Sequence, residues 1–325
     1  MSSRSTTPNP PAQPVDPTEL SPFEDATELL AEPEELRARA ARDGFLYFRG
    51  LLDAEPVLDL RRRILQVIDR NGLRAVPTDD PLSGRLDLDR LAAVPTADLR
   101  EDIGVTWAIY TELQKLPALH RLPHHPTLVG LYRVLFGAEV FVHPRHILRA
   151  MTPHPGVTAT PRHQDFPLVQ GSPDTWTCWI PVGDCPLTQG PLAVLRGSHH
   201  NGCLPIDLQP GAGGIAAQLC AQETDWVGGD LAVGDVLTFS SLTVHGGVPA
   251  SARDCVRLSM DVRYQRATDS IERRALGNHA HVPWSEIYAD WTEIDRDLMY
   301  YWAPGRLTFV DWDDDLMQPT GRRIC

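Results

Sequence analysis

Residues 255–264 read CVRLSMDVRY, and this stretch alternates between two kinds of side chain. Its even positions are apolar, from Val256 to Tyr264, and its odd positions include Arg257 and Ser259. Because successive side chains of a β-strand point to opposite faces, the stretch predicts a strand with one apolar and one polar face. In a barrel covered by helices, the polar face points inward, where a buried Arg257 requires an anion.

Short β-rich runs broken by Gly, Pro or Asp surround this strand. They are 140–151, 175–182, 192–195 and 236–239. Many short strands of this kind are typical of an antiparallel sandwich or barrel. Upstream, the apolar spacing and the flanking residues predict helices over 23–42, 53–70, 105–116 and 126–136, with a short strand over 45–49.

The expected fold class is therefore mainly β with flanking helices (α+β). We expect a single domain over 23–325, composed of a helical scaffold (23–136), a β core (about 137–267) and a C-terminal cap (268–325). The cap contains four tryptophans, for which we expect packing onto the barrel rather than stacking on substrate. Residues 1–22 are rich in Ser, Thr and Pro and are expected to form a flexible lead.

The charge balance restricts the class of partner. The chain has 43 acidic and 30 basic residues, a formal net charge of -13. Because nucleic acids and anionic membranes bind clustered positive charge, neither is an expected partner. A small-molecule substrate fits better, and the acidic balance favours a neutral or cationic metabolite over a coenzyme A thioester unless arginines gather locally. The substrate and the oligomeric state stay open.

The six cysteines are scattered, with no pair at the close spacing of a zinc or redox site. The start of the chain has no apolar stretch of the kind that a secretion signal needs. We therefore expect reduced thiols in a cytoplasmic protein.

A metal site is suggested by His163-Gln-Asp165, in which an imidazole and a carboxylate two residues apart point to the same side of an extended chain. His245, at the end of another β run, is the candidate third ligand. Two histidines and one carboxylate with open positions suit non-haem Fe(II) chemistry. The triplet alone is weak, since a chance His-x-Asp is expected in a chain of this length. The adjacent His199 and His200 are expected to serve a turn instead.

The inward-facing Arg257 has two possible roles, binding a carboxylate ligand or forming a structural ion pair. With Ser259 it can give a carboxylate two charge-assisted bonds and a hydroxyl. Alternatively, it pairs with Asp261 as a structural bridge.

Seven short motifs agree in order and spacing with a known family. They are His163-Gln-Asp165, Trp179-Ile-Pro-Val-Gly-Asp184, Gln189-Gly-Pro-Leu192, Gly197-Ser-His199, Gly234-Asp-Val-Leu237, His245-Gly-Gly247 and Arg257-Leu-Ser259. Over about residues 44–265 the sequence resembles the phytanoyl-CoA dioxygenase-like branch of the Fe(II)- and 2-oxoglutarate-dependent oxygenases.

The resemblance implies a double-stranded β-helix, a jelly-roll or cupin-like core. It implies iron held by His163, Asp165 and His245. It also implies that Arg257 binds the distal carboxylate of 2-oxoglutarate, beside three further pocket residues: Ser259, Trp179 and Gln164.

The implied reaction uses O2 and 2-oxoglutarate, releases succinate and CO2, and oxidises an unactivated C–H bond of a small metabolite. Hydroxylation is the expected outcome, in natural-product biosynthesis, although desaturation, cyclisation or epimerisation would use the same site. Asp165 disfavours halogenation, because related halogenases have a small residue in its place. The alternatives are a cupin-like metalloenzyme that does not use 2-oxoglutarate and a ligand-binding pseudoenzyme.

Overall fold

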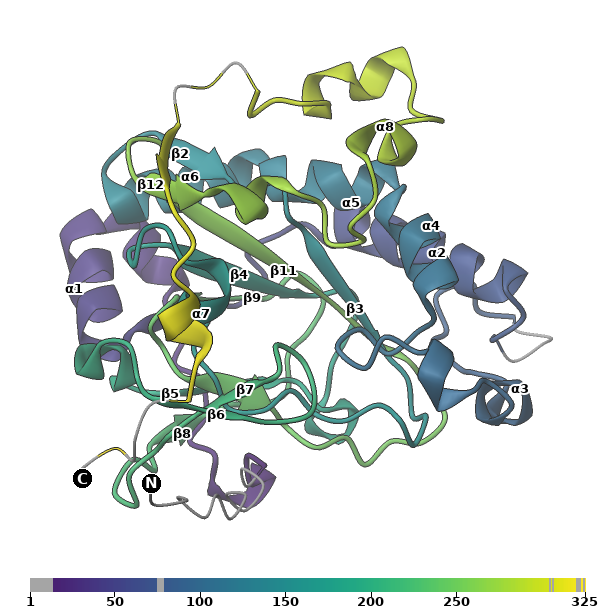
Figure 1. Cartoon of the computed structure of the whole chain (residues 1–325), viewed down its shortest axis with the longest axis horizontal. Helices are drawn as coiled ribbons and strands as arrows, with labels where there is room; N and C mark the ends of the chain where they lie inside the picture. Colours follow the sequence, from purple (N-terminus) through teal and green to yellow (C-terminus); the bar gives the residue numbers. More distant parts are fainter. Residues whose placement is uncertain (1–13, 75–78, 304, 306, 320–322, 324) are drawn as a thin grey trace, which may run out of the picture.

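The main sheet is organised around the strand that the alternating stretch predicted. In the computed structural model, which describes residues 14–325 except 75–78, 304, 306, 320–322 and 324, the order of this antiparallel sheet is β1-β9-β4-β11-β2, and β3 also pairs with β11. A smaller sheet has the order β10-β5-β8. Together the strands form a double-stranded β-helix flanked by helices (Figure 1), as expected.

The strands of the two sheets and the short pairs beside them have the following bounds: β1 (Phe45–Phe48), β2 (Val140–Val142), β3 (Ile147–Met151), β4 (Trp176–Pro181), β5 (Leu192–Leu195), β6 (Ile206–Leu208), β7 (Ile215–Ala217), β8 (Trp226–Val227), β9 (Val236–Ser240), β10 (His245–Gly247), β11 (Arg257–Arg266), β12 (Ser270–Glu272) and β13 (Thr308–Val310). The α-helices are α1 (Pro33–Asp43), α2 (Ala54–Arg70), α3 (Leu88–Ala92), α4 (Trp107–Gln114), α5 (Pro117–Arg121), α6 (Pro126–Phe136), α7 (Phe166–Val169) and α8 (Trp284–Ile287).

The apolar face of β11 packs against helices, as its alternation predicts. Leu258, Met260, Val262 and Tyr264 are buried in one cluster with apolar residues of α2, α4 and α6. The rings of Tyr264 and Tyr132 are stacked with centroids 3.9 Å apart. The main apolar core therefore lies between the sheet and the helices, which leaves the opposite face of β11 free to line the inside of the barrel.

Three helices, α2, α4 and α6, are close to their predicted bounds. The helix predicted over 23–42 is wrong in its first ten residues: α1 begins at Pro33, a residue suited to the first turn of a helix, and a 3-10 helix, Thr27–Ala31, precedes it. Gly44 and Gly137 follow α1 and α6 in the left-handed conformation, and the N–H of each bonds back to a carbonyl of the last turn. The connection between α2 and α4 contains the short helix α3.

Residues 14–22, the described part of the predicted flexible lead, contact the smaller sheet. Val15 is buried in a cluster with residues of the smaller sheet. Ser21 pairs with β8: its N–H donates to the carbonyl of Trp226, and its carbonyl accepts from Gly228, both at 2.9 Å. The burial of Val15 and the backbone hydrogen bonds of Ser21 hold this segment against the sheet. The amino-acid composition of the segment gave no sign of these two contacts. Residues 1–13 lie outside the described residues.

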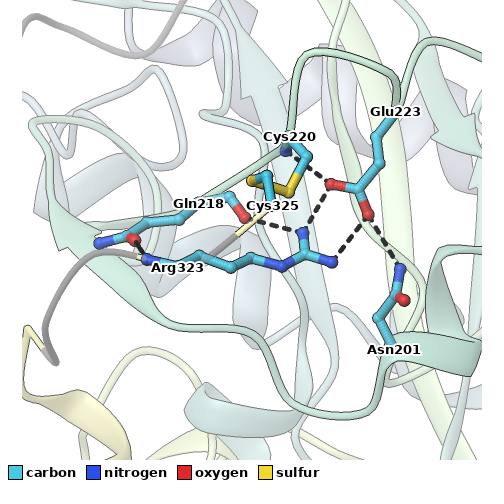
Figure 2. The surroundings of a disulfide bond; sticks show 6 residues. All are labelled: Asn201, Gln218, Cys220, Glu223, Arg323 and Cys325. Carbon is cyan, nitrogen blue, oxygen red and sulfur yellow. Dashed lines mark hydrogen bonds and ion pairs between the residues drawn. A yellow bond between two sulfur atoms is a disulfide. The ribbon is translucent and has the colours of Figure 1, made fainter.

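The prediction of six reduced thiols is wrong for two cysteines. Cys220 and Cys325, 105 residues apart, form a disulfide. Figure 2 shows Arg323 beside it, where its guanidinium is paired with the carboxylate of Glu223 and its backbone N–H donates to the side chain of Gln218 at 2.8 Å. The other four cysteines are free. This disulfide forms because the fold brings the end of the chain back to Cys220. The spacing of cysteines along the sequence does not show that path.

The C-terminal cap packs as expected around its aromatic residues. Ile287, Tyr288 and Trp302 are buried together, with Trp284 and Trp291 packed against them. After β13 the chain continues as the yellow segment of Figure 1 past α7, where Gln170 and the backbone of Asp313 exchange two hydrogen bonds. Among the described residues, no helix has both the length and the apolar character needed to cross a membrane.

Candidate metal centre and active site

The three predicted metal ligands converge where the two sheets meet. His163 forms an antiparallel β-bridge with His245 of β10, in which each backbone N–H donates to the other residue's carbonyl at 2.9 Å. One ligand atom from each of His163, Asp165 and His245 lies within 4.8 Å of the others, and all three residues are buried. One pair of backbone hydrogen bonds therefore brings together two histidines that are 82 positions apart in the sequence.

Both imidazoles present the same ring nitrogen to Asp165. Nδ1 of His163 faces the carbonyl of Pro161 at 2.8 Å, and Nδ1 of His245 faces the carbonyl of Thr243 at 3.0 Å. Because a carbonyl only accepts, each neutral ring carries its proton on Nδ1 and keeps a lone pair on Nε2. Burial, followed by the effect of His163, lowers the pKa of His245 to about 3, so this ring is neutral at physiological pH.

Asp165 is held by two side chains of the main sheet. Thr177 of β4 donates its hydroxyl to Oδ2 at 2.5 Å, and Nη2 of Arg263 in β11 lies 3.1 Å from both carboxylate oxygens. Burial alone would raise the pKa of Asp165, but Arg263 and the two histidines hold it well below its usual range. The carboxylate is therefore ionised and fixed in orientation.

These donors fit a divalent metal. Nε2 of His163 and Nε2 of His245 lie 3.6 and 3.8 Å from Oδ1 of Asp165. Two atoms that are each about 2.1 Å from one ion lie at most about 4.2 Å apart, so neither separation prevents shared coordination. Two imidazoles and one carboxylate on one side of the ion form the donor set that non-haem Fe(II) oxygenases use.

Thr177 and Arg263 were not predicted as site residues. Arg263 was visible in the sequence, because it shares the polar face of the stretch 255–264 with Arg257. The sequence did not show which acidic residue it meets, and the structure pairs it with Asp165. The only signal for Thr177 was its place in a predicted strand. The register of β4 against β11, with Thr177 opposite Arg263, brings both side chains to the same carboxylate.

The bridge between Arg257 and Asp261, the alternative to a ligand role, does not form. Asp261 accepts from Nε of Arg149 at 2.8 Å instead. Among the described residues, Arg257 has no ion pair; its Nη1 donates to the Ser259 hydroxyl, and its Nε is buried without a partner. Burial lowers the pKa of Arg257. This half-satisfied cation fits the carboxylate of 2-oxoglutarate.

Arg257 lines a different cavity from the metal ligands. Its cavity has a volume of about 410 Å³ and also contains Gly247 and Arg253. Gly247 is two residues after His245 in β10, and residues two apart in a strand face the same side. The Arg257 cavity therefore borders β10, the strand that begins with the metal ligand His245.

Trp179 is fully buried on the inner side of the barrel, next to Phe239 and Leu237. Its indole N–H has no partner among the described residues. A buried donor of this kind fits a ligand oxygen.

The structure does not bring Gln164 into the site. Its amide nitrogen donates to the carbonyls of Gly202 and Leu242 at 2.8 and 2.6 Å, and its amide oxygen accepts from the N–H of Leu204 at 2.7 Å. These bonds leave the side chain committed to the backbone. The physical reason is alternation, because Gln164 lies between two residues that face the metal site.

His199 and His200 serve a turn, as expected. They lie in a 3-10 turn, Ser198–Asn201, and their Nε2 atoms bond to the carbonyls of Ala41 and Arg42 at the end of α1. Both histidines therefore fasten α1 to the barrel.

A larger cavity of about 1070 Å³ contains His163 and Asp165 in its wall. The C-terminal cap contributes Trp284 and Trp312 to this wall, although packing alone was expected for these tryptophans. Cavities of this size hold small organic molecules. The metal ligands thus border a space large enough for a substrate.

Comparison with known proteins agrees with this architecture. Residues 40–255 match the family model described as "Phytanoyl-CoA dioxygenase (PhyH)". A curated relative, "1-deoxypentalenic acid 11-beta-hydroxylase" of Streptomyces exfoliatus, is 27% identical over 286 residues, which cover 83% of this chain and 93% of that protein.

Solved structures share the fold. EctD from S. alaskensis has a TM-score of 0.51 at 18% identity, with 84% of this chain and 89% of that chain covered. The epimerase SnoN in complex with Fe3+, alpha ketoglutarate and nogalamycin RO has a TM-score of 0.50 at 21% identity, covering 78% and 88%. The chain belongs to the phytanoyl-CoA dioxygenase family and is an Fe(II)- and 2-oxoglutarate-dependent oxygenase.

Proposed function

We propose that this enzyme hydroxylates an unactivated C–H bond of a small-molecule metabolite in natural-product biosynthesis. The observation that carries the proposal is the convergence of His163, Asp165 and His245, of which His163 and Asp165 lie in the wall of the large cavity. The curated relative's name describes hydroxylation of 1-deoxypentalenic acid, which supports both the reaction and the class of pathway.

In this proposal His163, Asp165 and His245 hold Fe(II), and Arg257 with Ser259 anchors 2-oxoglutarate. The bound iron, 2-oxoglutarate and O2 supply the oxidation of a C–H bond, with release of succinate and CO2. The protein fixes the geometry: two backbone carbonyls set the histidine tautomers, and Thr177 with Arg263 orients the carboxylate. The buried N–H of Trp179 offers a further donor on the inner wall. Gln164 is left out of this set.

The assignment is tested by two measurements on the same protein. An anaerobic titration with Fe(II) measures metal binding, and succinate release in the presence of O2 measures the use of 2-oxoglutarate. We expect His163→Ala to lose both, and His200→Ala, a histidine at the surface, to keep both.

The alternatives give different results. A cupin-like metalloenzyme that does not use 2-oxoglutarate would bind iron without releasing succinate. A ligand-binding pseudoenzyme would bind a ligand without releasing succinate. Normal metal content in His163→Ala would remove that residue from the ligand set.

We further propose a cytoplasmic location and a single oxygenase domain over 23–325. The four free cysteines support the first, and the continuity of packing from α1 to the C-terminal cap supports the second. Proteolysis under native conditions tests the domain, and cell fractionation tests the location.

A further inference from the structure

The large cavity is lined by arginines, although the protein as a whole is acidic. Six arginines contribute to its wall: Arg100, Arg145, Arg149, Arg263, Arg273 and Arg274. Only three acidic residues do so: Glu101, Asp102 and Asp165. The local charge is thus opposite in sign to the net charge of -13.

Three of these arginines already have a carboxylate. Arg100 is paired with Asp102 at 2.8 Å, Arg149 with Asp261 at 2.8 Å, and Arg263 with Asp165 at 3.1 Å. These pairs are part of the wall itself, so their charges are balanced before any ligand enters.

Arg145, in the connection between β2 and β3, is different. Within the described part of the chain it makes no ion pair, and its guanidinium reaches only the carbonyl of Asn278 at 3.5 Å and Nε2 of His281 at 3.4 Å. Burial, followed by the repulsion of Arg263, lowers the pKa of Arg145 to about 10. A partly buried cation with weak neutral partners is costly unless an anion joins it.

Two other wall arginines lie nearer the C-terminal cap and are engaged by rings. The guanidinium carbons of Arg273 and Arg274 lie 4.0 Å from the ring centroids of Phe309 and Trp312. Cation–π contacts lower the need for a counter-ion without removing it. Arg145 is therefore the strongest candidate for binding an anionic ligand.

The rest of the wall is suited to an apolar body. Its apolar and aromatic members include Trp107, Ile147, Leu168, Val169, Trp284 and Trp312. A ligand that matched this wall would have a hydrocarbon or aromatic body and one anionic group.

We propose that the substrate is an organic acid whose carboxylate binds Arg145 while its apolar body lies against the tryptophans of the cavity. This inference rests on the proposed function only in taking the large cavity as the substrate site. It replaces the sequence-based expectation of a neutral or cationic metabolite, because the arginines gather locally.

The test measures binding by calorimetry to the full-length enzyme, kept anaerobic with Fe(II) and 2-oxoglutarate so that no turnover occurs. The probes are decanoate, 1-naphthoate and 1-adamantanecarboxylate, each compared with its primary amide, which has the same shape and no charge. Coenzyme A is a separate probe for a thioester substrate. We expect at least one acid to bind about ten-fold more tightly than its amide, or better, since hydrogen bonds to charged groups are the stronger ones.

Arg145→Met should abolish this preference for the acid and change the affinity for the amide little. The matched control is Arg63→Met on α2, whose side chain is half exposed and paired with Asp59 outside the cavity; it should keep the preference. Arg145→Lys should restore part of it, because an ammonium keeps the charge without the planar fork.

The proposal is wrong if no acid probe binds better than its amide, or if Arg145→Met keeps the preference for the acid. It is also wrong if Arg274→Met, and not Arg145→Met, removes that preference. Tighter binding of coenzyme A than of every acid probe, through Arg145, would likewise overturn it. A separate titration of 2-oxoglutarate distinguishes this failure from failure of the proposed function. If Arg145→Met loses 2-oxoglutarate binding, Arg145 is a cosubstrate residue and the organic-acid proposal is wrong. If the wild-type enzyme does not bind 2-oxoglutarate at all, the proposed function fails instead.

Discussion

Asp165 receives contacts from several separate parts of the chain. Thr177 from β4 and Arg263 from β11 fix its oxygens, while His163 and His245 approach from the smaller sheet. Within the described part of the chain, Arg263 forms an ion pair with Asp165 alone, so replacing Asp165 leaves this buried arginine unpaired. Removing one partner of a buried ion pair costs about 3–5 kcal/mol.

For Asp165→Gly we expect loss of hydroxylation and at most trace chlorination when Fe(II), 2-oxoglutarate and excess chloride are supplied. The substitution opens a coordination position for chloride, but the residues that place the substrate are unchanged, and Arg263 offers chloride a second place to bind. Mass spectrometry of the products measures the outcome. Efficient chlorination would show that the carboxylate alone decides the reaction in this protein.

For Arg257→Leu we expect 2-oxoglutarate binding to weaken about 30-fold or more, because truncating one partner of a buried charge pair costs about 2–5 kcal/mol. Iron binding should survive, since no metal ligand is changed. Titration of 2-oxoglutarate against succinate release gives the measurement. Arg257→Lys should recover only part of the loss.

The control for that experiment is Arg253→Leu, because Arg253 is exposed and lines the same cavity. Arg263 is unsuitable, since its guanidinium holds Asp165. If Arg253→Leu rather than Arg257→Leu loses 2-oxoglutarate dependence, the cosubstrate is held at the mouth of the cavity.

At the scale of elements, the alternating sequence of β11 gives the strand two faces with different functions. Its even positions pack on α2 and α6, and its odd positions supply Arg257, Ser259 and Arg263 to the barrel. A shift of one residue would exchange the two faces, so the register with β4 is strongly specified.

The contact between α5 and the C-terminal cap gives a pH dependence. His120 of α5 is buried beside Trp284 and Trp291, and its Nε2 faces the carbonyl of Gln114 at 2.8 Å. Burial lowers the pKa of His120 to about 4, from 6.5. The unfolded chain therefore binds a proton that the folded chain excludes, so stability is full above pH 6.5 and is lost as the pH falls towards 4.

We expect the free energy of unfolding to fall by about 2 kcal/mol between about pH 7 and about pH 5 through His120 alone. Urea unfolding at both pH values measures this difference. The difference in the free energy of unfolding between the two pH values should be smaller by about 2 kcal/mol in His120→Phe. In His200→Phe, whose side chain is at the surface, this difference should be the same as in the wild type. An unchanged difference in His120→Phe would show that this ring does not control the pH response.

At the scale of the whole molecule, the disulfide closes a loop that contains the metal ligand His245, β11 and the C-terminal cap. Two interactions hold the end of the chain: the disulfide of Cys325 with Cys220 and the ion pair of Arg323 with Glu223 (Figure 2). This connection holds the segment after β13 along the barrel, past α7, which follows Asp165 directly.

We expect Cys325→Ser to lower the free energy of unfolding by about 2–4 kcal/mol, because the cross-link restricts the unfolded chain. Urea unfolding with and without reductant measures the effect. Reductant should destabilise the wild type and leave Cys325→Ser unchanged, and Cys203→Ser, which removes an exposed free thiol, should behave as the wild type. Thiol titration of the denatured wild type should find four free thiols; six would contradict the disulfide.

The sequence by itself determined the β-rich core, most of the helices before it and the strand 255–264 with its two faces, because these depend on periodicity and capping residues. The double-stranded β-helix and the candidate ligands His163, Asp165 and His245 followed from the resemblance of seven ordered motifs to a known family. Only the tertiary structure placed Arg145, which has no ion pair among the described residues, in the wall of the large cavity. It also decided that Arg263 pairs with Asp165, that Arg149 rather than Arg257 pairs with Asp261, and that Cys220 forms a disulfide with Cys325. Each of these pairs residues far apart in sequence, and a side chain's partner depends on strand register and on the return path of the chain, which composition and spacing do not contain.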